Sequence, residues 1–147
     1  MKRLAHLHLI AAGLVAAAPA VAQQATHLRD LDAANRATLS KDELQQLLPG
    51  ATISRVTNRG NRNIWKNEPG GGFVASSDNR DRGSTMPSTA RGQWSISDDG
   101  RYCVRIEWRS VEPEDWCRFI VRSGDAYYGT RSDQNPDERV YRLDITK

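Results

Sequence analysis

Two cysteines, Cys103 and Cys117, could support more kinds of chemistry than any other residues of this 147-residue chain. They lie in the stretch RYCVRIEWRSVEPEDWCRF, and a cysteine pair can bind zinc, cycle between thiol and disulfide, or form a structural disulfide. Their spacing is not the C-x-x-C of redox motifs. Zinc would need further soft ligands, yet the chain after residue 22 has a single histidine, His27. We therefore predict no metal site at the cysteines.

The first residues, MKRLAHLHLIAAGLVAAAPAVAQQ, have the three parts of a secretory signal peptide. Lys2 and Arg3 form the positively charged beginning, an apolar run follows, and Ala20-Val21-Ala22 supplies the small residues of a cleavage site. We predict that residues 1–22 are a signal peptide and that the protein is periplasmic or secreted, without a stable membrane anchor. An uncleaved anchor is the alternative, but the apolar run is short for a membrane span.

Export changes how the cysteines and the net charge are interpreted. Two cysteines in an oxidising compartment usually pair, so we predict a structural disulfide between Cys103 and Cys117. The chain has 21 Lys and Arg against 18 Asp and Glu, and loss of Lys2 and Arg3 leaves 19 basic residues and a net charge of +1. Basic and acidic residues are interspersed, as in NRDR and SDQNPDERVYR, so we predict no nucleic-acid binding.

Few residues could carry catalysis. His6 and His8 belong to the signal peptide, so a Ser-His-Asp or Cys-His arrangement would have to use His27. Carboxylate pairs can perform acid–base chemistry without histidine. The carboxylates that could do so are Asp98, Asp99, Glu114 and Asp115. We expect a hairpin turn and a solvated loop at these positions instead, and we assign no catalytic residues.

Two loops have a partial calcium-loop pattern. DNRDRG begins at Asp78, but arginines occupy its ligand positions. DQNPDE places Asp133, Asn135 and Asp137 at alternate positions, but Glu138 replaces the turn glycine. The three-glycine run before Phe73 lacks the Lys-Ser/Thr pair of a phosphate-binding loop. We therefore assign no metal and no cofactor.

Five aromatic residues could line a binding cavity: Trp65, Trp94, Tyr102, Trp108 and Trp116. Such residues more often fill the interior of a small barrel, and that is the interpretation we favour. A ligand pocket or a sugar-binding face is the alternative.

The elements that position these residues begin with a helix. Residues 23–38 lack a sustained apolar stripe and are predicted to be flexible or weakly helical. Ser40 and Glu43 then have the spacing of a capping box, and leucines follow at helical spacing until a Pro-Gly pair. The pattern predicts a helix over Lys41 to Leu48 at the start of a single β-barrel-like domain, residues 39–147.

After this helix the hydrophobic period changes to that of strands. The expected strands are ATISRVT, NIWK, FVASS, GQWSIS, RYCVRIEW, WCRFIVRS, AYYGTR and RVYRLDIT, with a long polar loop at residues 78–91. Short strands joined by Gly, Asp and Asn turns indicate a mainly β fold. We predict an antiparallel meander of about eight strands that forms a small barrel or curled sheet, preceded by one short helix.

The cysteine stretch also predicts its own strand register. If Cys103 lies opposite Cys117 in an antiparallel hairpin, Val104 lies opposite Trp116 and Arg105 opposite Asp115. Both are favourable cross-strand pairs. Alternation along RYCVRIEW places Tyr102, Val104, Ile106 and Trp108 on the core face.

On these residues the chain resembles an uncharacterised family of small exported bacterial proteins, a domain of unknown function. The likeness rests on LSKDELQQLLPGATI with its Leu-Pro-Gly helix end, on the Gly-x-Trp strand GQWSI, and on the Cys-Val…Trp…Cys hairpin YCVRIEW…WCRF. The resemblance implies a lipocalin-like small barrel and supplies no catalytic residues.

The function we expect is that of an exported, non-enzymatic barrel protein that binds a small ligand or a protein partner in the cell envelope. One alternative is a periplasmic inhibitor of a cell-wall hydrolase, similar to small disulfide-bonded lysozyme inhibitors. Another is an envelope enzyme that uses only carboxylates, which requires the four carboxylates above to line one concavity. A structural or assembly accessory is a further alternative.

Overall fold

The computed structural model describes residues 25–147, and the predicted signal peptide at 1–22 lies outside the described residues. The described chain forms one α-helix, two short 3-10 helices and nine strands. In chain order these are η1 (Leu28–Asp30), β1 (Arg36–Thr38), α1 (Lys41–Leu47), β2 (Thr52–Val56), β3 (Arg62–Lys66), β4 (Gly72–Ser77), η2 (Arg80–Arg82), β5 (Ser88–Ile96), β6 (Tyr102–Glu107), β7 (Glu114–Ser123), β8 (Ala126–Thr130) and β9 (Val140–Thr146).

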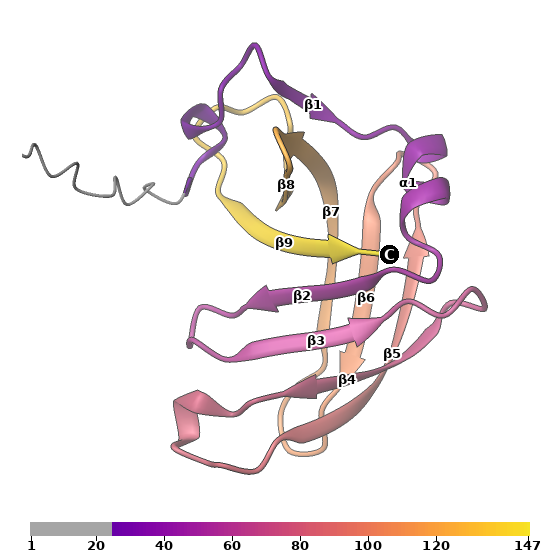
Figure 1. Cartoon of the computed structure of the whole chain (residues 1–147), viewed down its shortest axis with the longest axis vertical. Coiled ribbons are helices and arrows are strands. Elements are labelled where there is room, and N and C mark those ends of the chain that lie inside the picture. The colour runs from indigo at the N-terminus through magenta and orange to yellow at the C-terminus, as the bar shows by residue number, and fades with distance from the viewer. Residues whose placement is uncertain (1–24) are drawn as a thin grey trace, which may run out of the picture.

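Eight of these strands close into a ring (Figure 1). Each strand from β2 to β8 pairs antiparallel with the next, and β9 returns to pair with β2. Closure removes free sheet edges, which is the usual solution for an up-and-down barrel. The predicted antiparallel meander of about eight strands preceded by one short helix is therefore confirmed.

The strand β5 corrects the predicted loop at residues 78–91. It begins at Ser88, and its first residues continue the ladder with β4, where Ser88 lies opposite Ser77. The sequence STAR is mostly polar, and Ala90 is the one residue of it that is buried in the core. Hydrophobic alternation is therefore too weak there to indicate a strand.

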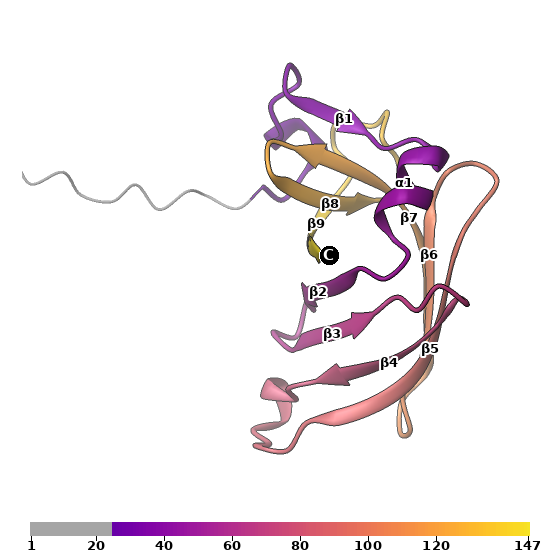
Figure 2. The ribbon, with the colours of Figure 1, turned by 45° about the vertical axis from the view of Figure 1, so that its right-hand side comes forward.

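The N-terminal segment has more structure than its sequence pattern indicates. In the described part of residues 23–38 one 3-10 turn, η1, is followed by the strand β1, and both pack on the outside of the barrel. Leu28 and Leu31 are buried in a second small core against β7, β8 and β9, separate from the barrel interior. Figure 2 shows this segment beside β8. Two leucines are enough for the contact, although they form no periodic stripe.

The helix α1 closes one end of the barrel. Its predicted capping box is confirmed: Glu43 N donates to Ser40 Oγ over 3.2 Å, and Ser40 N donates to Glu43 Oε2 over 2.8 Å. Leu44 and Leu48 are fully buried and join the main core cluster. We refer below to this side as the closed end and to the opposite side as the open end.

The hairpin of β6 and β7 has the predicted register. Cys103 lies opposite Cys117, Val104 opposite Trp116 and Arg105 opposite Asp115. The two sulfurs are bonded, and the Cα atoms are 4.0 Å apart. Tyr102 and Val104 are buried, so the alternating Cys103 and its partner face the outside of the barrel wall.

The interior includes one very close approach, between Phe73 and Gly92. These residues lie opposite each other on β4 and β5, and the Phe73 ring, stacked on Trp65, covers the glycine. A Cβ at Gly92 would lie 2.0 Å from a ring carbon of Phe73. Only glycine fits this position without moving a buried ring.

Substitution of this glycine is therefore expected to destabilise the fold. Gly92→Ala should lower the free energy of unfolding in urea by about 2 kcal/mol, because the buried Phe73 ring must shift. Gly70→Ala is the matched control, since a Cβ there meets no atom within 4 Å. Equal urea midpoints for the two variants would contradict this packing.

The disulfide should add stability through its effect on the unfolded chain. It joins residues 14 positions apart, and replacing both Cys103 and Cys117 by serine should cost about 3 kcal/mol of unfolding free energy. Reductant should lower the urea midpoint of the natural chain and leave that of the double variant unchanged. A natural chain that does not respond to reductant would argue against the bond.

Candidate functional site

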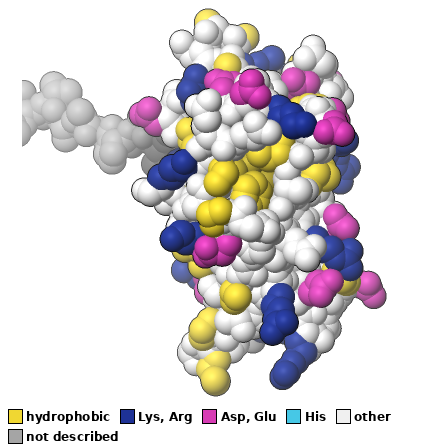
Figure 3. Space-filling view, turned by 90° about the vertical axis from the view of Figure 1, so that its right-hand side faces the viewer, with side chains coloured by type: hydrophobic (Ala, Val, Ile, Leu, Met, Phe, Trp, Pro, Cys, Tyr) yellow, Lys and Arg dark blue, Asp and Glu magenta, His cyan; other side chains and the backbone are white. Residues whose placement is uncertain are grey.

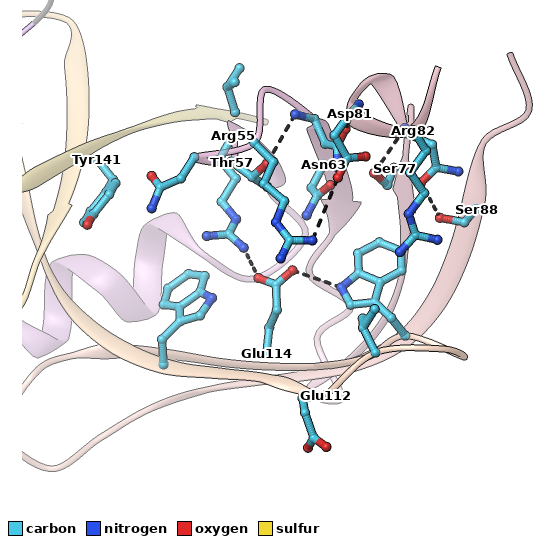
Figure 4. Close-up of a pocket in the computed structure, with 18 of the residues that line it drawn as sticks. Arg55, Thr57, Asn63, Ser77, Asp81, Arg82, Ser88, Glu112, Glu114 and Tyr141 are labelled. Carbon is cyan, nitrogen blue, oxygen red and sulfur yellow. Dashed lines mark hydrogen bonds and ion pairs between the residues drawn. The ribbon is translucent and has the colours of Figure 1, made fainter. Parts of the chain in front are cut away.

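A pocket of about 740 Å³ occupies the open end of the barrel. Its lining comes from inward positions of the strands and from the loops at that end, including the loop after β6 (Figure 4). Pockets of this size accommodate ligands as large as common drugs. The rest of the interior, toward α1, is filled with side chains.

Glu114 stands at the centre of this pocket (Figure 4). Its carboxylate forms an ion pair with the Arg55 guanidinium and accepts a hydrogen bond of 2.9 Å from Trp108 Nε1. The Arg55 guanidinium also lies 5.3 Å from the ring centroid of Trp116. Arg55 belongs to β2 and Glu114 to β7, which share no ladder, so the ion pair bridges the interior. It also neutralises one half-buried positive charge.

Three buried polar atoms in the lining have no hydrogen-bond partner among the described residues. They are Arg55 Nε, Asn63 Oδ1 and Trp116 Nε1. Asn63 is only 2% exposed, so its side chain cannot rely on bulk water. Buried polar groups in proteins nearly always have a partner. These three atoms lie behind the pocket surface, each with less than 1 Å² accessible, so a bound molecule would reach them only if the side chains that cover them move.

A second arginine, Arg118, also points to the pocket, two residues after Trp116 on β7. Its Nη1 donates to Cys117 O over 2.9 Å, but within the described chain no carboxylate lies within 4.0 Å of it. Burial and then the positive charge of Arg131 lower the pKa of Arg118, while Tyr141 and Glu138 act in the opposite direction. This half-buried charge is therefore only weakly compensated.

The lining as a whole carries more positive than negative charge. It contains six arginines against three acidic residues. One of the three, Glu112, points away from the pocket centre in Figure 4, and another, Asp81, is paired with Arg59 at 4.0 Å. Four of the six arginines are exposed, so most of this positive charge lies where the lining meets solvent, while Arg55 and Arg118 lie deeper.

The predicted aromatic set divides between the two ends. Trp65 and Tyr102 are core residues near the closed end, and only Trp108 and Trp116 line the pocket. Trp94 lies partly exposed at the closed side, where its Nε1 donates to Glu68 O over 2.8 Å.

Trp65 and Tyr102 share a buried hydrogen-bond network with Asn67. Trp65 Nε1 donates to Asn67 Oδ1 and to the Tyr102 hydroxyl, both over 3.1 Å, and that hydroxyl donates to Asn67 Oδ1 over 2.9 Å. Asn67 Nδ2 donates to Leu48 O over 3.2 Å. These groups satisfy one another's hydrogen-bonding capacity, so we assign them a structural role.

The four carboxylates proposed for an envelope enzyme do not converge. Asp98 and Asp99 lie in the β5–β6 turn near α1, where Asp98 pairs with Lys41 at 3.0 Å. Asp115 is exposed and pairs with Arg105 at 3.2 Å, while Glu114 alone enters the pocket. The concavity that this hypothesis required is absent from the described residues, so the hypothesis was wrong in that respect.

The two calcium-like loops have structural contacts instead. Asp78 Oδ1 accepts a hydrogen bond of 2.8 Å from Arg62 N, and Asp137 pairs with Arg29. Within residues 25–147, no group of three or more His, Cys, Asp or Glu side chains could hold a metal ion.

The outer surface has mixed charge. On the face in Figure 3, basic and acidic side chains are interspersed around a central group of hydrophobic side chains. None of the described helices is both long and apolar enough to cross a membrane.

Sequence reasoning missed Arg55, Asn63 and Arg118 as pocket residues. For Arg118 a signal was present, because Glu114, Trp116 and Arg118 alternate on one face of β7 once Val104 is placed opposite Trp116. For Arg55 and Asn63 the signal is weak, because polar residues on short strands normally indicate the solvent face.

Comparison with known proteins places the chain in a family without an assigned role. A family model described as "Protein of unknown function (DUF995)" matches residues 11–135. The match includes β1 to β8 and most of the pocket lining. No curated protein and no solved structure matches the chain.

The buried network predicts a loss of stability in alkali. Burial raises the pKa of Tyr102 far above its ordinary value of 10.0, against the smaller opposing effect of its hydrogen bonds to Trp65 and Asn67. Above about pH 10 the unfolded chain releases the phenol proton and the folded chain keeps it, so the unfolding free energy should fall by about 1.4 kcal/mol per pH unit.

Tyr102→Phe should remove this part of the pH dependence, measured as urea midpoints between pH 8 and 11.5. Tyr141→Phe is the control, because it leaves the Tyr102 hydroxyl in place. The same slope in the Tyr102→Phe protein would show that another group titrates.

Proposed function

From the premise that the chain belongs to the DUF995 family of proteins of unknown function, we propose that it is a non-enzymatic binding protein of the cell envelope. Its ligand is a small molecule that enters the barrel at the open end. The pocket is large enough for such a molecule, and α1 fills the other end.

The observation that carries this proposal is the set of unpartnered buried atoms Arg55 Nε, Asn63 Oδ1 and Trp116 Nε1. A protein without a ligand gains nothing from burying such groups, because each loses its hydrogen bonds to water. In the same molecule the Trp65–Tyr102–Asn67 network is fully paired. The contrast supports a bound molecule as the missing partner.

The cellular location in this proposal rests on two observations. The first 22 residues have the pattern of a signal peptide, and a disulfide joins β6 to β7. Structural disulfides persist in oxidising compartments such as the periplasm. A periplasmic or secreted protein accounts for both.

A neutral fluorescent probe tests whether the pocket admits a ligand. We expect N-phenyl-1-naphthylamine to bind the purified mature chain at one site per molecule, with a rise in probe fluorescence. Ser77→Phe should reduce this affinity at least tenfold, because Ser77 is 5% exposed and its side chain faces the pocket from β4.

Ser76→Phe is the matched control on the outer face of the same strand and should bind like the natural chain. Both variants must first show cooperative urea unfolding. Equal loss of probe binding in both variants would refute the proposal, and so would failure of the folded natural chain to bind either this probe or its charged analogue, which is introduced below.

Inhibition of a cell-wall hydrolase remains the competing prediction, because the loop after β6 exposes Val111 to 44% beside the open end. The same samples separate the two functions. If the protein is an inhibitor that acts through this loop, its Ser77→Phe variant should still inhibit lysozyme. If it is only a ligand-binding protein, neither the natural chain nor the variant should inhibit lysozyme.

A further inference from the structure

We propose that the ligand is an organic anion, whose oxyanion head pairs with Arg118 inside the barrel while its apolar or aromatic body lies against Trp108 and Trp116. This inference rests on the proposed function and specifies the chemical class of the ligand. The head could be a carboxylate or a phosphate ester, and the experiment below separates them.

The charge balance of the interior is the first support. Glu114 is the acidic residue at the centre of the pocket, and it is already paired with Arg55. Arg118 has no such partner within the described chain, and Arg131 adds a second positive charge nearby. A half-buried, unpaired guanidinium is costly, and an anion is the ligand that would compensate it.

The space around Arg118 is the second support. On β8, the neighbouring inward position is Gly129, where a Cβ would lie 3.5 Å from the Cβ and Cγ of Arg118. The same Cβ would lie 3.5 Å from Cδ1 of Leu143, so this position of β8 adds no side chain of its own beside the stem of Arg118. Arg118 belongs to the pocket lining together with Tyr141, whose hydroxyl is a further potential donor.

The unpartnered atoms give the third support. Arg55 Nε and Trp116 Nε1 are donors only, and each needs an acceptor, which a bound molecule can supply once the side chains that cover these atoms move. An ionised carboxylate or phosphate offers only acceptors, so its chemistry is complementary to this pair. Asn63 Oδ1 is an acceptor and would fit a hydroxyl or amine on the body of the same molecule. An organic cation would face the arginine excess instead.

Two dyes that differ by one charged group test the inference. N-phenyl-1-naphthylamine is neutral, and 8-anilino-1-naphthalenesulfonate is the same molecule with a sulfonate. We expect the natural chain to bind the sulfonate at least tenfold more tightly at low salt, with the preference reduced at 0.5 M NaCl. Arg118→Gln should abolish the preference, measured as the ratio of the two affinities in the same variant.

Arg142→Gln is the control for net charge, because Arg142 is exposed on the outer face of β9 next to Asp144. The Arg142→Gln protein should keep the preference for the sulfonate dye. Equal affinity of the natural chain for the two dyes would overturn the anion proposal and leave the proposed function standing. Binding of neither dye would refute the proposed function itself.

Stability and competition complete the test. Because Arg118 is weakly compensated, Arg118→Gln without ligand should unfold at the same urea concentration as the natural chain or a higher one. A clear decrease in the urea midpoint of Arg118→Gln would overturn the inference, because it would show that the protein itself stabilises the charge of Arg118. Benzoate or phenyl phosphate should displace the bound sulfonate dye, and the stronger competitor identifies the head group. Displacement by neither at 10 mM would also overturn it.

Discussion

The shape of this barrel depends on the hydrogen bonds of the Asn67 side chain. Its amide accepts hydrogen bonds from Trp65 and Tyr102 and donates to the carbonyl of Leu48 at the end of α1. Its backbone N–H and C=O pair with Ala51 and Gly50, over 2.9 and 2.7 Å. One fully buried residue thus ties β3, β6 and the helix together, so the barrel is closed on this side.

The two ends of the barrel differ in how completely their polar groups are paired. With its polar groups paired, the closed half can exclude water, and the apolar residues there pack as an ordinary core. Among residues 25–147, the polar groups of the open half are less completely paired. The ion pair of Arg55 with Glu114 spans two strands that are not neighbours in the sheet, and the polar groups around it are only partly satisfied. The same eight strands therefore surround a packed core at the closed end and a pocket at the open end.

The sequence allowed the local parts of this arrangement to be predicted, and not the long-range ones. The capping box of α1 and the register of β6 with β7 follow from spacings of a few residues. The contact of Arg55 with Glu114 follows from ring closure, because β2 meets β9 at the far end of the chain. Strand β1 and the first residues of β5 were missed because their side chains are mostly polar or exposed. Their pairing comes from neighbouring backbones and not from a hydrophobic pattern.

Strand β7 connects stability with the pocket. Its outward residue Cys117 is bonded to Cys103, and its inward neighbours Trp116 and Arg118 line the pocket. A covalent link directly behind two such residues limits sliding of β7 along β6, and a slip of one residue would reverse which side chains face inward. The cysteines thus contribute no chemistry of their own. Their effect is to hold an indole and a guanidinium at defined positions, and under the proposed function such fixed donors would reduce the entropy lost on binding.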